Sequence, residues 1–158
     1  MNKEKQEQCE RFYYSLPDPP KVVNGAYDPV DNVIYLPVPI TEKNDFYYQT
    51  LLHEYLHAKL FHYDIRDIVD VDSGDFFTLE ELISECGTAV LSNMLDIYNK
   101  DNQKIILEYL RYWKNELNDK SLLQKIFLVL KTILEEILDR EITKRDIPID
   151  VRILLGLF

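Results

Sequence analysis

Two of the three histidines in this 158-residue sequence, His53 and His57, lie four residues apart, and Glu54 follows the first of them. Residues four apart on an α-helix differ by about 40° around the axis and by about one turn along it, so both imidazoles can bind one metal ion. Glu54 is turned by about 100° from His53, which lets it reach a metal-bound water without being a ligand. This H-E-x-x-H pattern predicts a Zn2+ site in which Glu54 is the catalytic acid/base.

A catalytic zinc ion usually has three protein ligands and one open position for water, so another part of the chain must supply a ligand. The best candidates are Glu81 and Glu85, which lie four residues apart on one helical face. We expect Glu81 to bind the metal and Glu85 to orient a ligating histidine, with Glu85 as the alternative ligand. The alternative stays open because Thr78 and Glu81 also have the spacing of a capping box, which would engage Glu81 at the start of a helix.

Three neighbouring residues are expected to lie outside the metal shell. Glu80 is expected to be solvated. His62 comes nine residues after His53, half a revolution away on a helix, which favours a surface position. Cys86 is expected to be a buried core thiol.

The elements that must position these residues are mostly helices. Leucines recur at every fourth position within 41–62, the spacing of a buried stripe, and Asn44 or Asp45 can cap this helix. The residues from 63 to 77 carry five aspartates and lack periodicity, so we expect a loop there. Other helices are predicted over 3–15, 78–98, 101–117 and 120–139.

A segment rich in β-branched and aromatic residues follows the first predicted helix. It predicts a hairpin with strands near 22–27 and 33–37 around a turn at 28–32. Pro37 and Pro39 indicate that the second strand lies at a sheet edge, where it could bind an extended substrate by strand addition. The expected fold class is α+β, mainly α, with a small N-terminal β-hairpin or sheet and about five helices.

The composition limits the class of protein. A chain of 158 residues that is 46% hydrophobic and 29% charged fits a single domain over residues 1–158. The net charge of −10 argues against direct nucleic-acid binding and against an anionic membrane as partner. The chain has only two cysteines, a charged opening segment and no apolar run near the about 18–20 residues that cross a bilayer, so we expect a cytoplasmic setting.

The H-E-x-x-H run, followed by Glu-Glu-Leu-x-x-Glu, resembles the C-terminal zincin-like metallopeptidase domain of ArdC-type antirestriction proteins. The segments that carry the resemblance are 25–27, 31–34, 36–37, 46–54, 80–91 and 112–120. The resemblance implies a gluzincin-like arrangement, with His53, His57 and Glu81 on zinc and Glu54 as the acid/base. The spacing of Glu81 and Glu85 is also similar to the E-x-x-x-D pattern of thermolysin-like peptidases, in which the first acid binds the metal. The chain resembles the IrrE/ImmA type of regulatory protease more distantly, through the same arrangement of ligands.

The expected function is zinc-dependent hydrolysis of peptide bonds in a protein or peptide substrate, in an antirestriction or regulatory role. One alternative is an acidic binding protein that imitates DNA, which the net charge and the aspartates between 64 and 75 favour. Another is a non-catalytic zinc-binding domain, which would have four protein ligands and no open position.

Overall fold

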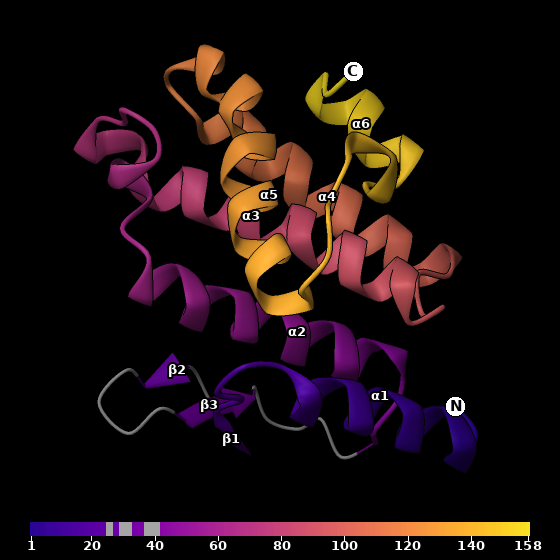
Figure 1. The fold of residues 1–158 in the computed structure, drawn as a ribbon. Helices are drawn as coiled ribbons and strands as arrows, with labels where there is room; N and C mark the ends of the chain where they lie inside the picture. Colours follow the sequence, from indigo (N-terminus) through magenta and orange to yellow (C-terminus); the bar gives the residue numbers. More distant parts are fainter. Residues whose placement is uncertain (25–26, 29–32, 37–41) are drawn as a thin grey trace.

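The computed structural model describes residues 1–24, 27–28, 33–36 and 42–158, and helices dominate them (Figure 1). The α-helices are α1 (Lys3–Ser15), α2 (Asp45–His62), α3 (Ser73–Met94), α4 (Lys100–Glu116), α5 (Ile126–Leu138) and α6 (Ile149–Leu155). Short 3-10 helices are η1 (Ile65–Asp67), η2 (Lys120–Lys125) and η3 (Lys144–Asp146). The prediction of a mainly helical fold is confirmed, with six α-helices in these described ranges where about five were expected.

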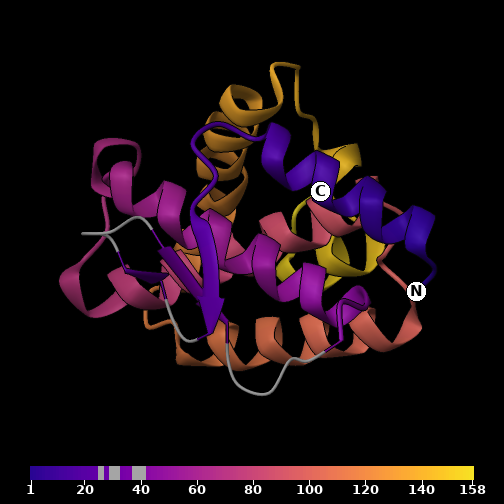
Figure 2. The same ribbon diagram turned by 90° about the horizontal axis from the view of Figure 1, so that it is seen from below.

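Helix α3 is the centre of the packing. All of its residues from Leu82 to Ser92 are buried, and it packs against α2, α4 and α5. The strands and α1 lie on the other side of α2 from α3 (Figure 1), and they are nearest the viewer when the molecule is seen from below (Figure 2). Helix α2 is therefore enclosed between two layers, which fixes the direction in which each of its side chains points.

The start of α2 follows from its cap. The side chain of Asn44 accepts a hydrogen bond from the backbone N–H of Tyr47 at 3.0 Å, as expected for a residue of this type at a helix N-terminus. Of the two predicted caps, Asn44 is confirmed, and α2 begins at Asp45 rather than near residue 41. It ends at His62 as predicted.

The small sheet contains three strands in the order β1-β3-β2. Strand β1 (Lys21–Asn24) is parallel to β3 (Val33–Leu36), whereas β2 (Tyr27–Asp28) is antiparallel to it. The predicted hairpin between 22–27 and 33–37 is therefore wrong in its first strand, because β-propensity identifies strands but not their partners or directions. The predicted edge position of the second strand is also wrong, since β3 is the middle strand. Residues 29–32 of the predicted turn lie outside the described residues, and so do Pro37 and Pro39.

The predicted loop over 63–77 is wrong in its last part, because α3 already begins at Ser73. Asp75 is buried in the first turn of α3, where its carboxylate accepts hydrogen bonds from the backbone N–H groups of Asn118 and Asp119 at 2.7 and 2.9 Å. These bonds hold the pKa of Asp75 below its usual value. A buried aspartate that binds two backbone N–H groups looks the same in the sequence as a solvated one.

The C-terminal part of the chain packs onto the helical layer. The helix predicted over 120–139 is divided into η2 and α5, and the tail after it forms η3 and α6. Val151, Leu155 and Leu157 are buried, so the tail is a docked segment. In the part of the chain that the structure describes, no helix combines the length and the apolar character needed to cross a membrane.

Candidate metal centre

The sequence neighbours of the two histidines hold α2 in place. Leu52, Tyr55 and Leu56 are buried, and the Tyr55 hydroxyl donates a hydrogen bond to the carbonyl of Pro17 at 3.0 Å. With these side chains fixed in the core, the two imidazoles lie on the side of α2 that meets α3. Their side chains are 17% and 14% exposed, so a small ion could still reach them.

Gly87 allows α3 to approach α2 closely. A Cβ atom at this position would lie 2.7 Å from Cδ1 of Leu56 and 3.1 Å from Cδ1 of Leu130, closer than van der Waals contact permits without a shift. Leu56 directly precedes His57, and Glu81 lies less than two turns before Gly87 on α3. The close approach of the helices therefore brings the carboxylate of Glu81 to the imidazoles.

Three ligand atoms converge between α2 and α3. The Nε2 atoms of His53 and His57 are 3.0 Å apart. One oxygen of Glu81 lies 3.2 Å from Nε2 of His57, and the other lies 3.5 Å from Nε2 of His53. Among the described residues these three side chains form a group that could hold a metal ion.

The separations fit a small transition-metal ion. Ligand atoms about 2.0–2.1 Å from a tetrahedral centre are about 3.3 Å from one another. The three measured separations, 3.0, 3.2 and 3.5 Å, surround that value. Two imidazoles with one carboxylate also form a donor set that suits zinc and similar ions better than Mg2+ or Ca2+, which prefer oxygen ligands.

Two further carboxylates lie behind the imidazoles. Oε1 of Glu85 is 2.9 Å from Nδ1 of His53, and Oε1 of Glu80 is 2.9 Å from Nδ1 of His57. The contact of Glu80 with His57 is a hydrogen bond of the kind that fixes a ring tautomer, whereas Glu85 lies within ion-pair distance of Nδ1 of His53 without the geometry of a hydrogen bond. The expectation that Glu85 lies beside a ligating histidine agrees with this geometry. The expectation that Glu80 is solvated is wrong, because its side chain is only 19% exposed and contacts His57.

The charges of the cluster are strongly coupled. Burial alone would lower the pKa of His53, but its contacts with Glu81 and Glu85 raise it to about 10. Burial would also lower the pKa of His57, but its contacts with Glu80 and Glu81 raise it to about 9. Burial would raise the pKa of Glu81, yet the two imidazoles lower it to about 2. The site therefore requires positive charge between α2 and α3, which protons or a metal ion can supply.

Glu54 faces the open side of the cluster. A cavity of about 250 Å³ is lined by Glu54 together with His53, Glu81 and Glu85, so Glu54 shares a solvent-accessible space with the candidate ligands. Glu54 is not one of the three converging residues. Glu54 therefore lies beside the cluster without belonging to it, as the H-E-x-x-H spacing predicts.

The remaining sequence predictions near the site have clear outcomes. The capping box is wrong, because Thr78 lies within α3, five residues after its start at Ser73. Glu81 is thus not engaged at a helix start. His62 is exposed at the end of α2, away from the cluster, as expected. Cys86 is fully buried, and burial raises the pKa of its thiol to about 12, in agreement with a core position.

Some residues of the site were not singled out from the sequence. Gln49 lies one turn before His53 on α2 and lines the same cavity. Tyr109 and Trp113 of α4 also line this cavity. The helical spacing could have placed Gln49 on the face of His53. No sequence motif connects α4 to α2, so the two aromatic residues could not have been found in this way.

Comparison of the chain with protein-family models, with curated proteins and with solved structures finds no match.

Proposed function

We propose that the protein is a zinc-dependent metallopeptidase of the zincin-like type that hydrolyses peptide bonds. The observation that carries the proposal is the convergence of His53, His57 and Glu81 beside a cavity that Glu54 also lines. His53 and His57 would be ligands through Nε2, and Glu81 would be the third ligand. Three converging residues in the described part of the chain favour catalysis over a structural zinc site, which would need a fourth protein ligand.

Each residue has a distinct role in this proposal. Zinc, when bound, supplies a water of lowered pKa and polarises the substrate carbonyl. Glu54 accepts the proton of the attacking water and then passes it to the nitrogen of the leaving amine. Glu85 and Glu80 hold the rings of His53 and His57 in the ligating orientation through Nδ1.

The test is the Glu54→Gln variant of the whole chain. It keeps the shape of the side chain and removes its ability to accept a proton. We expect zinc content, measured by elemental analysis, to equal that of the parent, and cleavage of an unfolded protein such as casein to fall by about 100-fold or more.

Glu7→Gln is the matched control, because it makes the same chemical change on the exposed surface of α1. Cleavage should be unchanged in this control. If Glu54→Gln cleaved as fast as the parent, Glu54 would not be the base and the mechanism would fail. If the purified protein contained iron instead of zinc, the assignment of the metal would be wrong, while Glu54→Gln would still test the hydrolytic route, because iron can also activate a bound water.

The DNA-mimic alternative rests on the acidic segment between residues 64 and 75. Two of its five aspartates have partners in the molecule, since Asp64 pairs with Arg66 and Asp75 is buried. The other three, Asp67, Asp70 and Asp72, are exposed. Three carboxylates form a small charged surface compared with the phosphates of a duplex. The resemblance to antirestriction proteins agrees with a regulatory role. The Glu54→Gln variant distinguishes the two proposals, because it should remove cleavage and leave binding by an acidic surface intact.

A further inference from the structure

A larger apolar groove along α4 adjoins the cavity at the candidate metal centre. This second cavity has a volume of about 560 Å³. We call it the aromatic groove, and it is lined by Phe46, Ile105, Glu108, Tyr109, Tyr112 and Trp113. Four of these residues, namely Phe46, Ile105, Tyr109 and Trp113, also line the metal-site cavity. The two cavities therefore adjoin each other.

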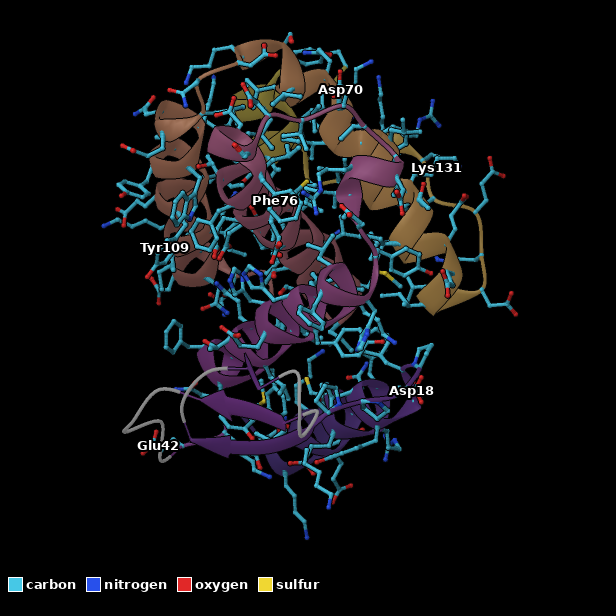
Figure 3. The ribbon with its side chains drawn as sticks, turned by 90° about the vertical axis from the view of Figure 1, so that its left-hand side faces the viewer. Asp18, Glu42, Asp70, Phe76, Tyr109 and Lys131 are labelled. Atoms are coloured by element: carbon cyan, nitrogen blue, oxygen red, sulfur yellow. The ribbon has the colours of Figure 1, made fainter. Side chains whose placement is uncertain are left out.

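The aromatic residues of the groove are not core residues. Ile106 and Leu110 are buried on the core side of α4, whereas Tyr109 and Tyr112 are each 54% exposed. Phe46, on the first turn of α2, is 41% exposed. Figure 3 shows Tyr109 on the opposite side of the molecule from Lys131 of α5. Large aromatic side chains gathered around a hollow, and left open to solvent, are typical of a binding surface.

Carboxylates predominate among the charged groups of the lining. Glu108 lies in the aromatic groove, and Glu54, Glu81 and Glu85 lie in the metal-site cavity beside His53, while no lysine or arginine of the described residues lines either cavity. A metal ion would neutralise the charge at Glu81, whereas Glu108 is exposed on α4 and lines the aromatic groove but not the metal-site cavity. A ligand with a positive charge beside its apolar part complements this surface.

Gln49 supplies an independent observation. Its side chain lines the metal-site cavity and is only 5% exposed, yet within the described part of the chain its Oε1 has no hydrogen-bond partner. A buried carbonyl oxygen without a partner is costly, and it is satisfied when a ligand brings a donor. This oxygen is itself closed to solvent, so a ligand in the cavity reaches it only when the side chain of Gln49 turns towards the ligand. The backbone N–H of an extended peptide is such a donor, and it would pass one turn of α2 away from His53.

We propose that the site selects an extended peptide segment in which a bulky aromatic side chain next to the scissile bond fills the aromatic groove, with a lysine or arginine two residues away, on the same face of the peptide, at Glu108 and a backbone N–H donated to Gln49. This inference rests on the proposed peptidase function and defines its substrate class. Tyr109 and Trp113, which line both cavities, contact the aromatic side chain. Glu108 determines the preference for a cationic neighbour.

The experiment measures binding separately from cleavage. The zinc-loaded Glu54→Gln chain is titrated with fluorescein-labelled eight-residue peptides that differ only at two central positions separated by one glycine. These two positions hold Phe-Lys, Ala-Lys or Phe-Glu, and the peptides are named after them. We expect Phe-Lys to bind about tenfold or more tightly than Ala-Lys, because an aromatic ring is buried. We expect it to bind several-fold more tightly than Phe-Glu, with a difference that shrinks as salt is added.

Variants assign these preferences to the groove. Tyr109→Ala should remove most of the preference for Phe, and Glu108→Gln should remove the preference for Lys. The matched controls are Tyr14→Ala and Glu7→Gln, which change exposed residues of α1 and should leave both preferences intact. Equal binding of all three peptides, or preferences that survive in the groove variants, would overturn the proposal.

Gln49 is tested with a methylated peptide. Methylation of the one backbone N–H that Gln49 accepts should weaken binding to the parent but not to Gln49→Leu, whose melting temperature is measured to confirm that it is folded. If no methylated position behaves differently in the two proteins, Gln49 does not hold the peptide.

The outcomes also separate this inference from the proposed function. Cleavage by the parent chain without any preference among the three peptides would retain the peptidase and reject the groove. Selective binding of Phe-Lys to Glu54→Gln, without cleavage by the zinc-loaded parent, would retain the groove as a peptide-binding surface and reject the peptidase.

Discussion

Each imidazole at the candidate metal centre lies between two carboxylates. Nε2 of His53 and His57 points towards Glu81, and Nδ1 of each ring lies 2.9 Å from a second acid, Glu85 or Glu80. Glu81 alone of the three acids reaches both Nε2 atoms. The geometry thus favours Glu81 over Glu85 as the third ligand, which the spacing of the two acids could not decide.

The two acids should differ in their effect on zinc affinity. Glu85→Gln should weaken binding by about 10–100-fold, the range for loss of an outer carboxylate. Glu81→Gln should weaken it further, because a ligand is lost. Competition with a chromogenic zinc chelator measures both affinities, with Glu7→Gln as the control. The reverse order would show that Glu85 is the ligand.

At the scale of the elements, the site depends on the distance between α2 and α3. Gly87 has no side chain to separate them, and its place is filled by the side chains of Leu56 and Leu130. Leu56 belongs to the same turn of α2 as the two histidines. A change at Gly87 should therefore alter both the stability of the protein and the position of Glu81.

Gly87→Ala should destabilise the protein although alanine is the better helix former. Overpacking costs about 1–3 kcal/mol, which exceeds the gain in helix propensity of up to about 1 kcal/mol. The matched control is Gly74→Ala in the first turn of the same helix, where the nearest atom to a new Cβ would be Nδ2 of Asn118 at 4.0 Å. That variant should be as stable as the parent or more stable.

Urea unfolding measures both variants, and zinc affinity reports on Glu81. We expect Gly87→Ala to lose stability and to bind zinc more weakly. Equal stability of the two alanine variants would show that α2 and α3 can separate at Gly87 without cost.

At the scale of the whole molecule, the cluster links folding to protons and metal. In the metal-free protein the pKa values of His53 and His57 are about 10 and 9, against 6.5 for an unperturbed histidine. Their contribution to stability is therefore fully present below pH 6.5, and it is lost as the pH rises through 9 and 10. The pKa of Glu81 is about 2 against 4.5, so its contribution is present above pH 4.5 and is lost as the pH falls towards 2.

We expect the melting temperature of the metal-free chain to decrease between pH 6.5 and 10. Zinc binds the deprotonated ligands, so its binding releases protons and becomes tighter as the pH rises over the same interval. Stabilisation by a fixed concentration of zinc should then increase with pH. Scanning calorimetry with and without the metal measures both trends.

The double variant His53→Gln/His57→Gln is the control, because it should lose the zinc effect and most of the pH dependence. His62→Gln, which changes an exposed histidine at the end of α2, should behave like the parent. A metal-free melting temperature that stays constant from pH 6.5 to 10 would show that the imidazoles are not held by the acids around them.

The sequence by itself determined the parts of this protein that depend on local geometry. The step of four residues between His53 and His57, the apolar spacing around them and the cap at Asn44 predict a helix with two imidazoles on one face, and α2 has this form. The mainly helical composition of the fold followed from similar periodicities. These features could be predicted because the 3.6-residue repeat fixes relations between near neighbours in a chain.

The tertiary structure decided the features that depend on separate segments. These include the position of Glu81 near both Nε2 atoms, the contact of Glu80 with His57, the helical position of Thr78 and the order of the strands. Asp75 shows the reason clearly, since its partners are backbone groups of residues 118 and 119, more than forty positions away. Which side chains meet across α2, α3 and α4 is set by the packing of the buried faces, in which one small residue, Gly87, determines how closely two helices approach.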